Sequence, residues 1–130
     1  MAHSFKPQGY TSVSPYFIVN GAQEFVDFVK ALFDAEELRR YDNEDGSIMH
    51  AEVRIDDTVI MLGQSSEQYP PTGFWMHVYV PDARASYEKA LSLGCEGIEA
   101  PVNKEGDPDV RGTFKDHWGN FWAVGTQGVS

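Results

Sequence analysis

The segment TSVSPYFIVNGAQEFVDFVKALF (residues 11–33) joins a strand pattern directly to a helix pattern, and this pair is the basis of the predicted fold. Polar and apolar residues alternate from Thr11 to Val19, as in a strand with one buried face. Asn20 is then the expected helix N-cap. Beyond it, apolar residues recur three and four positions apart, which predicts a helix with one buried stripe: Ala22, Phe25, Val26, Val29, Leu32 and Phe33.

The same strand and helix return later in the chain. The stretch FWMHVYV (residues 74–80) again predicts a strand, and Val80 lies 61 residues after Val19. A second helix is expected from about residue 83 to residue 93, with Asp82 as its N-cap and Gly94 as the left-handed residue at its end. Identity between the halves is slight, so the order of elements is what indicates a repeat.

Three further strands are expected after each helix, separated by turn residues such as those of Asn43–Gly46. The sequence therefore predicts an α+β fold with two tandem βαβββ modules, at about residues 11–64 and 74–126. We expect a curved, cavity-lining mixed sheet with the helices on its outer face, in a single domain over residues 1–130. The additional strands are expected at residues 36–41, 47–55, 58–64, 97–103, 110–115 and 121–126.

Alternation also predicts which way the strand side chains face. The aliphatic positions should pack under the helices: Val13, Pro15, Phe17, Val19, Met49, Ala51, Val53, Ile55, Phe74, Met76, Val78 and Val80. Trp122 is expected in the core as well. The opposite face is polar and aromatic, and function is expected on it.

Composition narrows the class of partner. The chain has 130 residues and a formal net charge of −10, which argues against nucleic acid and anionic membranes and favours neutral or cationic ligands. Cys95 is the single cysteine, so no internal disulfide can form, and we expect an inert, partly buried thiol rather than a nucleophile. No apolar run reaches membrane-spanning length and the N-terminus lacks an apolar signal core, so a cytoplasmic protein is expected.

An ordered set of segments resembles the glyoxalase/bleomycin-resistance/extradiol-dioxygenase superfamily, also called the vicinal-oxygen-chelate superfamily, and more closely its PhnB-like group. The last segment is similar to the family's Asp-Pro-x-Gly turn, with His117 where proline is usual. The segments are TSVSPYFIV (11–19), IMHAEVRI (48–55), VIML (59–62), HVYVPD (77–82) and DHWGNFW (116–122).

The resemblance implies four places at which metal-dependent members bind a divalent cation, typically through His and Glu. In this chain those places hold Ser14, Met61, Trp75 and Ala123. Trp75 and Ala123 cannot ligate, and the other two are poor ligands for the ions of this fold. We therefore predict that the usual metal site is absent and that no cofactor is bound. If the alignment of the strand at residues 74–80 with the family is shifted by two residues, His77 occupies the ligand place instead of Trp75. His50 and Glu52 could then join His77 in a rearranged metal site.

Three functions remain open. The first is a binding protein similar to the bleomycin-resistance branch, which holds a small aromatic or cationic molecule. The second is a metal-dependent lyase or dioxygenase, and the third a metal-free enzyme that uses His50 or His77 as acid or base. A purely structural hydrogen-bonding role for His50 is the alternative to each. The resemblance also implies a homodimer. The expected ligand-binding residues are Ser14, Tyr16, His50, Glu52, Met61, Trp75, His77, Tyr79, Arg111 and Phe121.

Overall fold

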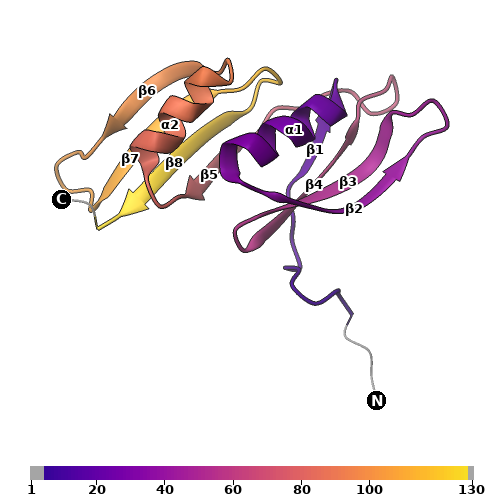
Figure 1. Cartoon of the computed structure of the whole chain (residues 1–130), viewed down its shortest axis with the longest axis horizontal. Helices are drawn as coiled ribbons and strands as arrows, with labels where there is room; N and C mark the ends of the chain where they lie inside the picture. Colours follow the sequence, from indigo (N-terminus) through magenta and orange to yellow (C-terminus); the bar gives the residue numbers. More distant parts are fainter. Residues whose placement is uncertain (1–4, 129–130) are drawn as a thin grey trace. The chain divides into compact units, whose positions relative to one another are not determined.

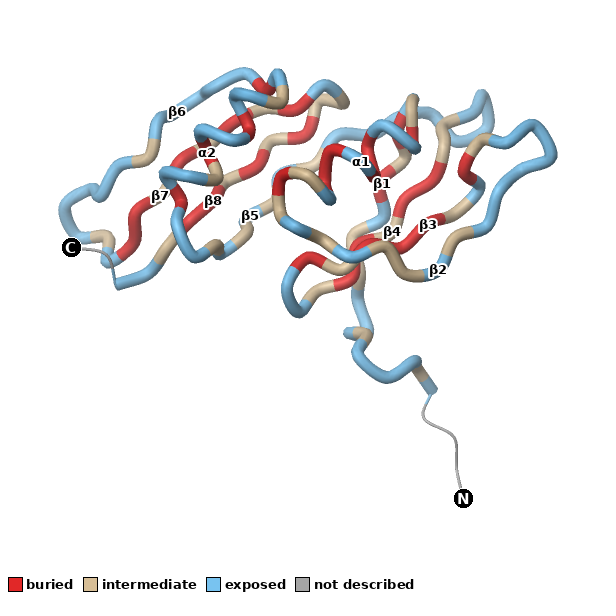
Figure 2. Tube along the Cα trace, viewed as in Figure 1, coloured by how far each residue is buried: buried red, intermediate tan, exposed pale blue. Residues whose placement is uncertain are grey.

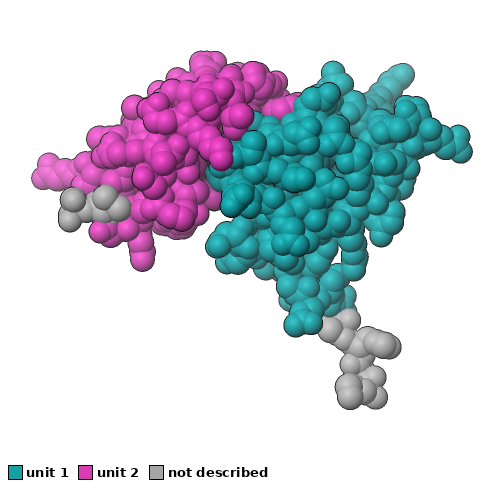
Figure 3. Space-filling view, viewed as in Figure 1, with its two compact units in different colours: residues 1–71 teal, residues 72–130 magenta. Residues whose placement is uncertain are grey.

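The computed structural model describes residues 5–128. The chain divides into two compact units, Met1–Pro71 and Thr72–Ser130, which are drawn in different colours in Figure 3. Each unit is described by itself below. No helix within residues 5–128 has the length and apolar character needed to cross a membrane.

Unit 1 is one βαβββ module (Figure 1). Its strands form a four-stranded sheet in the order β1-β4-β3-β2, in which β1 and β4 are parallel and the other pairs are antiparallel. A parallel pair needs a long crossover connection, and the helix lies within that connection. The elements are β1 (Tyr16–Val19), α1 (Ala22–Phe33), β2 (Glu36–Asp42), β3 (Ile48–Ile55) and β4 (Thr58–Gln64).

Unit 2 repeats this topology. Its sheet has the order β5-β8-β7-β6, and β5 is parallel to β8. The predicted α+β class and tandem βαβββ order are thus confirmed over the described residues. The elements are β5 (Trp75–Tyr79), α2 (Ala83–Ser92), β6 (Glu96–Val102), β7 (Asp109–Lys115) and β8 (Phe121–Gln127).

Each helix covers one face of its own sheet, and the core of each unit lies between them (Figures 1 and 2). In unit 1 the predicted stripe of α1 is buried except for Phe33, which is half-buried, and Phe28 is buried in addition. The sheet residues Phe17, Val53 and Leu62 are fully buried in the same unit. In unit 2 the core includes Phe114 and Trp122, which is 1% exposed and confirms its prediction. Cys95 is buried, and burial raises the pKa of its thiol to about 12, as expected for an inert cysteine.

Two predictions about strand faces are wrong. Val13 is 84% exposed, because β1 begins only at Tyr16. Met49 is 54% exposed, and Ile48 occupies the core instead at 1% exposure. The cause is a register shift between β2 and β3, where Tyr41 pairs with His50 but Asp42 pairs with Ile48. Such a bulge inserts one residue into the strand and turns its neighbours to the other face.

The start of α1 also differs from the prediction. Asn20 does not cap the helix, because the N-cap position is Gly21, in a left-handed conformation with φ of 96°. Gln64 Oε1 accepts hydrogen bonds from the backbone N–H groups of Gly21 and Ala22 at 3.1 and 3.0 Å. Asn20 instead accepts a hydrogen bond from the Gln64 amide. A residue from β4 therefore caps this helix.

The predicted ends of α2 are confirmed. Asp82 accepts a hydrogen bond from Ala85 N at 3.1 Å, and Gly94 has φ of 95°. Residues next to α2 in the sequence thus cap both of its ends, and for this reason the local sequence predicts these ends correctly.

A buried carboxylate organises the turn before β8. Asp116 is 5% exposed and accepts hydrogen bonds at 2.8–2.9 Å from Trp118 N, Asn120 N, Asn120 Nδ2 and Trp122 Nε1. Since all four partners are donors, an acceptor-only group suits the position.

We predict that Asp116→Asn lowers the free energy of unfolding by about 2–4 kcal/mol, because the new NH₂ group faces donors and leaves buried groups unsatisfied. Urea denaturation measures this. The exposed turn residue Asp57 provides the matched control, since Asp57→Asn should change the free energy by less than about 0.5 kcal/mol. Equal effects of the two substitutions would contradict this account of the turn.

Candidate ligand-binding faces

The face of each sheet opposite its helix is called the open face here. On the open face of unit 1, four side chains form a continuous hydrogen-bonded chain. Tyr10 Oη donates to Glu52 Oε1, and the other carboxylate oxygen of Glu52 lies 2.8 Å from His50 Nε2. His50 Nδ1 lies in turn 3.0 Å from Tyr16 Oη. The predicted residues Tyr16, His50 and Glu52 are therefore brought together, and Tyr10 joins them from the segment before β1.

Glu52 is the charged end of this chain. It is 4% exposed, and burial alone would raise its pKa. The hydrogen bonds from His50 and Tyr10 outweigh burial, so the pKa of Glu52 lies below its ordinary value. Hydrogen bonding to Glu52 raises the pKa of Tyr10, and burial raises the pKa of Tyr16. At neutral pH, Glu52 is ionised and both phenols keep their protons.

Gly63 of β4 leaves the space in which these hydrogen-bonded side chains meet. A Cβ added at Gly63 of β4 would lie 2.6 Å from the Met49 carbonyl oxygen and 3.3 Å from Tyr16 Oη. The bond between Tyr16 on β1 and His50 on β3 can therefore pass over the strand between them only because that strand has no side chain here.

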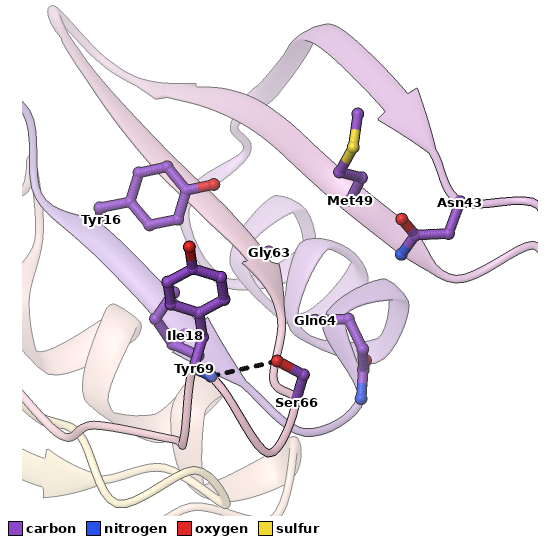
Figure 4. A pocket seen from close by; sticks show the side chains of 8 residues that line it. All are labelled: Tyr16, Ile18, Asn43, Met49, Gly63, Gln64, Ser66 and Tyr69. Atoms are coloured by element: carbon purple, nitrogen blue, oxygen red, sulfur yellow. Dashed lines mark hydrogen bonds between the residues drawn. The ribbon is translucent and has the colours of Figure 1, made fainter.

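A pocket of about 480 Å³ opens beside Tyr16, as Figure 4 shows. The rings of Tyr16 and Tyr69 lie on one side of it, with Met49 and Asn43 on the other. Sequence reasoning found Tyr16 but missed the other lining residues. The glycine inside the β4 pattern was the available signal, because it marks a close approach. The lining residues are Tyr16, Ile18, Asn43, Met49, Gly63, Gln64, Ser66 and Tyr69.

On the open face of unit 2, aromatic rings dominate. Trp75 and Phe121 stack with ring centroids 4.3 Å apart and an interplanar angle of 9°. Trp75 is 66% exposed, and Lys115 Nζ lies 5.5 Å from the Phe121 ring centroid. His77 and Tyr79 make a second contact, edge to face at 4.6 Å. Two predicted residues, Trp75 and Phe121, thus form one exposed planar surface.

Arg111 links the polar residues of this face. Its guanidinium donates to Asp109 Oδ2 at 2.6 Å and to Asp107 Oδ2 at 3.0 Å, and its Nη1 contacts His77 Nε2. Tyr79 Oη also donates to Asp109, at 2.9 Å. Burial, followed by the nearby positive charge of Arg111, lowers the pKa of His77. The imidazole is therefore neutral at neutral pH, and its Nε2 lone pair is already occupied by Arg111.

The two open faces are built on the same register. Tyr16 pairs with Met61 in unit 1, and His77 pairs with Ala123 in unit 2. A Cβ at Gly125 would lie 3.0 Å from His77 Nε2, just as one at Gly63 would crowd Tyr16. His77 is thus the equivalent of Tyr16, which supports the alignment that places Trp75 at the position of Ser14.

The side chains at the four family ligand places do not fit a divalent cation. Ser14 precedes β1 and Met61 is half-buried on β4, so unit 1 offers a hydroxyl and a thioether. Unit 2 offers the stacked Trp75 indole and the Ala123 methyl group, neither of which has a lone pair for a metal. Among residues 5–128, no three His, Cys, Asp or Glu side chains gather in a group that could hold a metal ion. The alternative metal site of His50, Glu52 and His77 is divided between the units, with His50 and Glu52 in unit 1 and His77 in unit 2. Neither unit by itself therefore holds all three side chains.

The lowered pKa of Glu52 predicts how stability depends on pH. Above its ordinary pKa of 4.5, Glu52 is ionised in both states and its hydrogen bonds stabilise the fold. As pH falls below 4.5, the unfolded chain binds the proton first, so this stabilisation is lost until the lower folded pKa is passed. We expect Glu52→Gln to be less stable at neutral pH by about 1–3 kcal/mol and to lose less stability on acidification.

Urea denaturation of both proteins across this acidic range measures the effect. Glu88→Gln, at an exposed position of α2, is the control and should follow the original protein. Parallel pH profiles for Glu52→Gln and the original protein would show that this carboxylate is not held in its charged form.

Comparison with known proteins agrees with the fold. The model of the Glyoxalase/Bleomycin resistance protein/Dioxygenase superfamily matches residues 11–124. Uncharacterized protein Mb0911c of Mycobacterium bovis is 30% identical over 125 residues, which cover 88% of this chain and 82% of that protein. Uncharacterized protein Rv0887c of Mycobacterium tuberculosis is also 30% identical over 125 residues, covering 88% and 73%.

Solved structures with low identity share the fold. TioX from Micromonospora sp. ML1 has a TM-score of 0.72 at 17% identity, covering 92% of this chain and 98% of that one. A Bacillus cereus structure titled as a putative 3-demethylubiquinone-9 3-methyltransferase, PhnB protein, has a TM-score of 0.72 at 15% identity, covering 89% and 99%. The fosfomycin resistance protein FosX from Mesorhizobium loti has a TM-score of 0.64 at 18% identity, covering 89% and 91%. By its family match and its doubled βαβββ fold, the chain belongs to the Glyoxalase/Bleomycin resistance protein/Dioxygenase superfamily.

Proposed function

We propose that this protein binds a small aromatic molecule on the open face of unit 2. The observation that carries the proposal is the exposed stack of Trp75 on Phe121. A large aromatic ring that is two-thirds exposed buries little area in the folded unit, so stability alone does not account for it. A planar ligand placed against the free face of Trp75 would extend the stack and remove further apolar area from water.

Charge separates the possible ligands. The net charge of −10 attracts cations to the protein as a whole. Close to the aromatic rings the positive and negative charges cancel. Arg111 is paired with Asp107 and Asp109, and Lys115 lies over Phe121. We therefore propose an aromatic ligand whose charge is zero or positive, in keeping with a binding protein of the bleomycin-resistance type.

The competing enzymatic functions lack an observation in their favour. No reaction step can be derived through a metal, because the side chains at the family ligand places are unsuitable donors. His50 holds Glu52 and Tyr16 through its two nitrogens, and His77 Nε2 is held by Arg111. A general base needs a free lone pair directed at its substrate. Ligand binding is therefore the function that we propose.

Isothermal titration calorimetry with proflavine, a planar tricyclic cation, tests the proposal. We expect saturable binding with one site, and binding of anthracene-2-sulfonate, a planar anion, to be weaker. Trp75→Ala should weaken proflavine binding about tenfold, because it removes the stacking partner. The substitution is at an exposed position, so folding should be retained.

Leu91→Ala is the matched control, since Leu91 is an exposed apolar residue of α2, the helix on the opposite side of this sheet. It should leave proflavine binding unchanged. Failure of the folded protein to bind either planar compound, or equal binding by Trp75→Ala, would refute the proposed site.

We also propose a homodimer, which the family resemblance implies. The exposed Ile98 and Val102 side chains of the edge strand β6 support this, because exposed apolar surface favours association and they are not part of the proposed ligand site. Light scattering after size-exclusion chromatography should give twice the chain mass of 14.6 kDa. A single species of 14.6 kDa would contradict the proposal.

A further inference from the structure

The pocket of unit 1 is separate in sequence and chemistry from the Trp75 face, and the proposed function does not use it. Its volume of about 480 Å³ falls within the range of small-molecule sites. It is lined by phenol, amide, hydroxyl and aliphatic groups, with no Asp, Glu, Lys or Arg among its lining residues. This lining favours an uncharged ligand with both apolar and polar parts.

Much of the polar lining is already engaged by the protein. The Gln64 amide caps α1 and binds Asn20. The Asn43 amide donates to Ser47 Oγ, and Ser66 Oγ accepts from Tyr69 N. Tyr16 Oη differs from these groups because it is hydrogen-bonded to His50, which is in turn hydrogen-bonded to the buried carboxylate of Glu52. These bonds determine whether the Tyr16 hydroxyl donates or accepts.

The direction of each hydrogen bond follows from Glu52. A carboxylate can only accept, so the proton on His50 must lie on Nε2, which is 2.8 Å from Glu52 Oε2. In the neutral imidazole Nδ1 then carries a lone pair and accepts the proton of Tyr16 Oη, 3.0 Å away. The Tyr16 phenol keeps its proton, since its pKa is raised, but that proton points at His50. What remains on the Tyr16 oxygen is its acceptor capacity.

We infer that the pocket of unit 1 is a second ligand site, which selects an uncharged amide by accepting its N–H on the oxygen of Tyr16. Tyr16 is the binding residue, and His50 and Glu52 are positioning residues that fix the direction of its hydrogen bond. Gly63 is required because its missing side chain lets Tyr16 Oη reach both His50 and the pocket. The apolar part of the amide would lie against Met49, Ile18 and the Tyr69 ring.

Two matched probes test the inference. Benzamide and methyl benzoate have similar size and a carbonyl group, but only benzamide has N–H donors. Both are titrated into ¹⁵N-labelled protein, and affinity is followed at the amide signals of Gly63 and Ser66. We expect benzamide to bind between about twofold and tenfold more tightly than the ester, the range of one hydrogen bond.

Three variants assign the preference to the chain of hydrogen bonds. Tyr16→Phe should bring the affinity ratio close to one, because the acceptor is gone. His50→Phe should also reduce the ratio, because the Tyr16 hydroxyl is then free to donate to either carbonyl. Tyr41→Phe is the control: it removes the hydroxyl of an exposed tyrosine whose ring centroid lies 6.1 Å from that of His50 and which does not line the pocket, so it should leave the ratio unchanged.

The tautomer of His50 provides a readout that requires no substitution. ¹⁵N chemical shifts of the imidazole should show the proton on Nε2 at slightly alkaline pH. A proton on Nδ1, equal affinities for the two probes, an unchanged ratio in Tyr16→Phe, or no binding at Gly63 and Ser66 would each overturn the inference. Since Trp75 is not involved, these outcomes are distinct from failure of the proflavine site.

Discussion

Each sheet of this protein has a single helix to cover it, and this constraint shapes everything else. Four strands present two faces, but one amphipathic helix can bury only one of them. The apolar residues of each unit therefore collect between helix and sheet, as with Phe17 and Val53 under α1. The helix also spans the crossover that makes β1 parallel to β4, and α2 does the same for β5 and β8. The open face of each sheet does not pack against the helix, so its residues need not be apolar.

That open face has the same geometry in both units but different chemistry. A side chain on the first strand reaches one on the third strand across a glycine of the last strand. In unit 1 Tyr16 reaches His50 over Gly63, and the chain ends in the buried carboxylate of Glu52. In unit 2 His77 meets Arg111 at Gly125, and the cation is balanced by acidic residues.

These differences are the basis of the two ligand proposals. We propose a polar neutral molecule for the uncharged pocket beside Tyr16 and a planar aromatic molecule for the Trp75–Phe121 stack. At Trp75 and Ala123 the metal-dependent relatives would carry ligands, and this chain carries an indole and a methyl group. A stacking surface thus stands where the resemblance places metal ligands.

Local patterns predicted most of the fold, because hydrophobic periodicity reports directly on burial. They failed where a distant residue decided a local detail. Asn20 was expected to cap α1, but Gln64 of β4 supplies the acceptor. Met49 was expected in the core, but the bulge opposite Asp42 turns it outward and puts Ile48 in its place. Neither the distant acceptor nor the bulge leaves a trace in the order of polar and apolar residues along the sequence, so a prediction from that order cannot include them.

Hydrophobic periodicity alone indicates the two βαβββ modules, the core stripes and the polar and aromatic character of the open faces. It also placed Trp75 and His77 on one face, since alternate residues of a strand share a side. Which side chains contact one another depends on the tertiary structure. The Tyr10–Glu52 bond, the Tyr16–His50 bond and the Trp75–Phe121 stack each join residues far apart in the sequence. Periodicity fixes the side of a strand on which a residue lies, but strand register and a missing Cβ fix its partner.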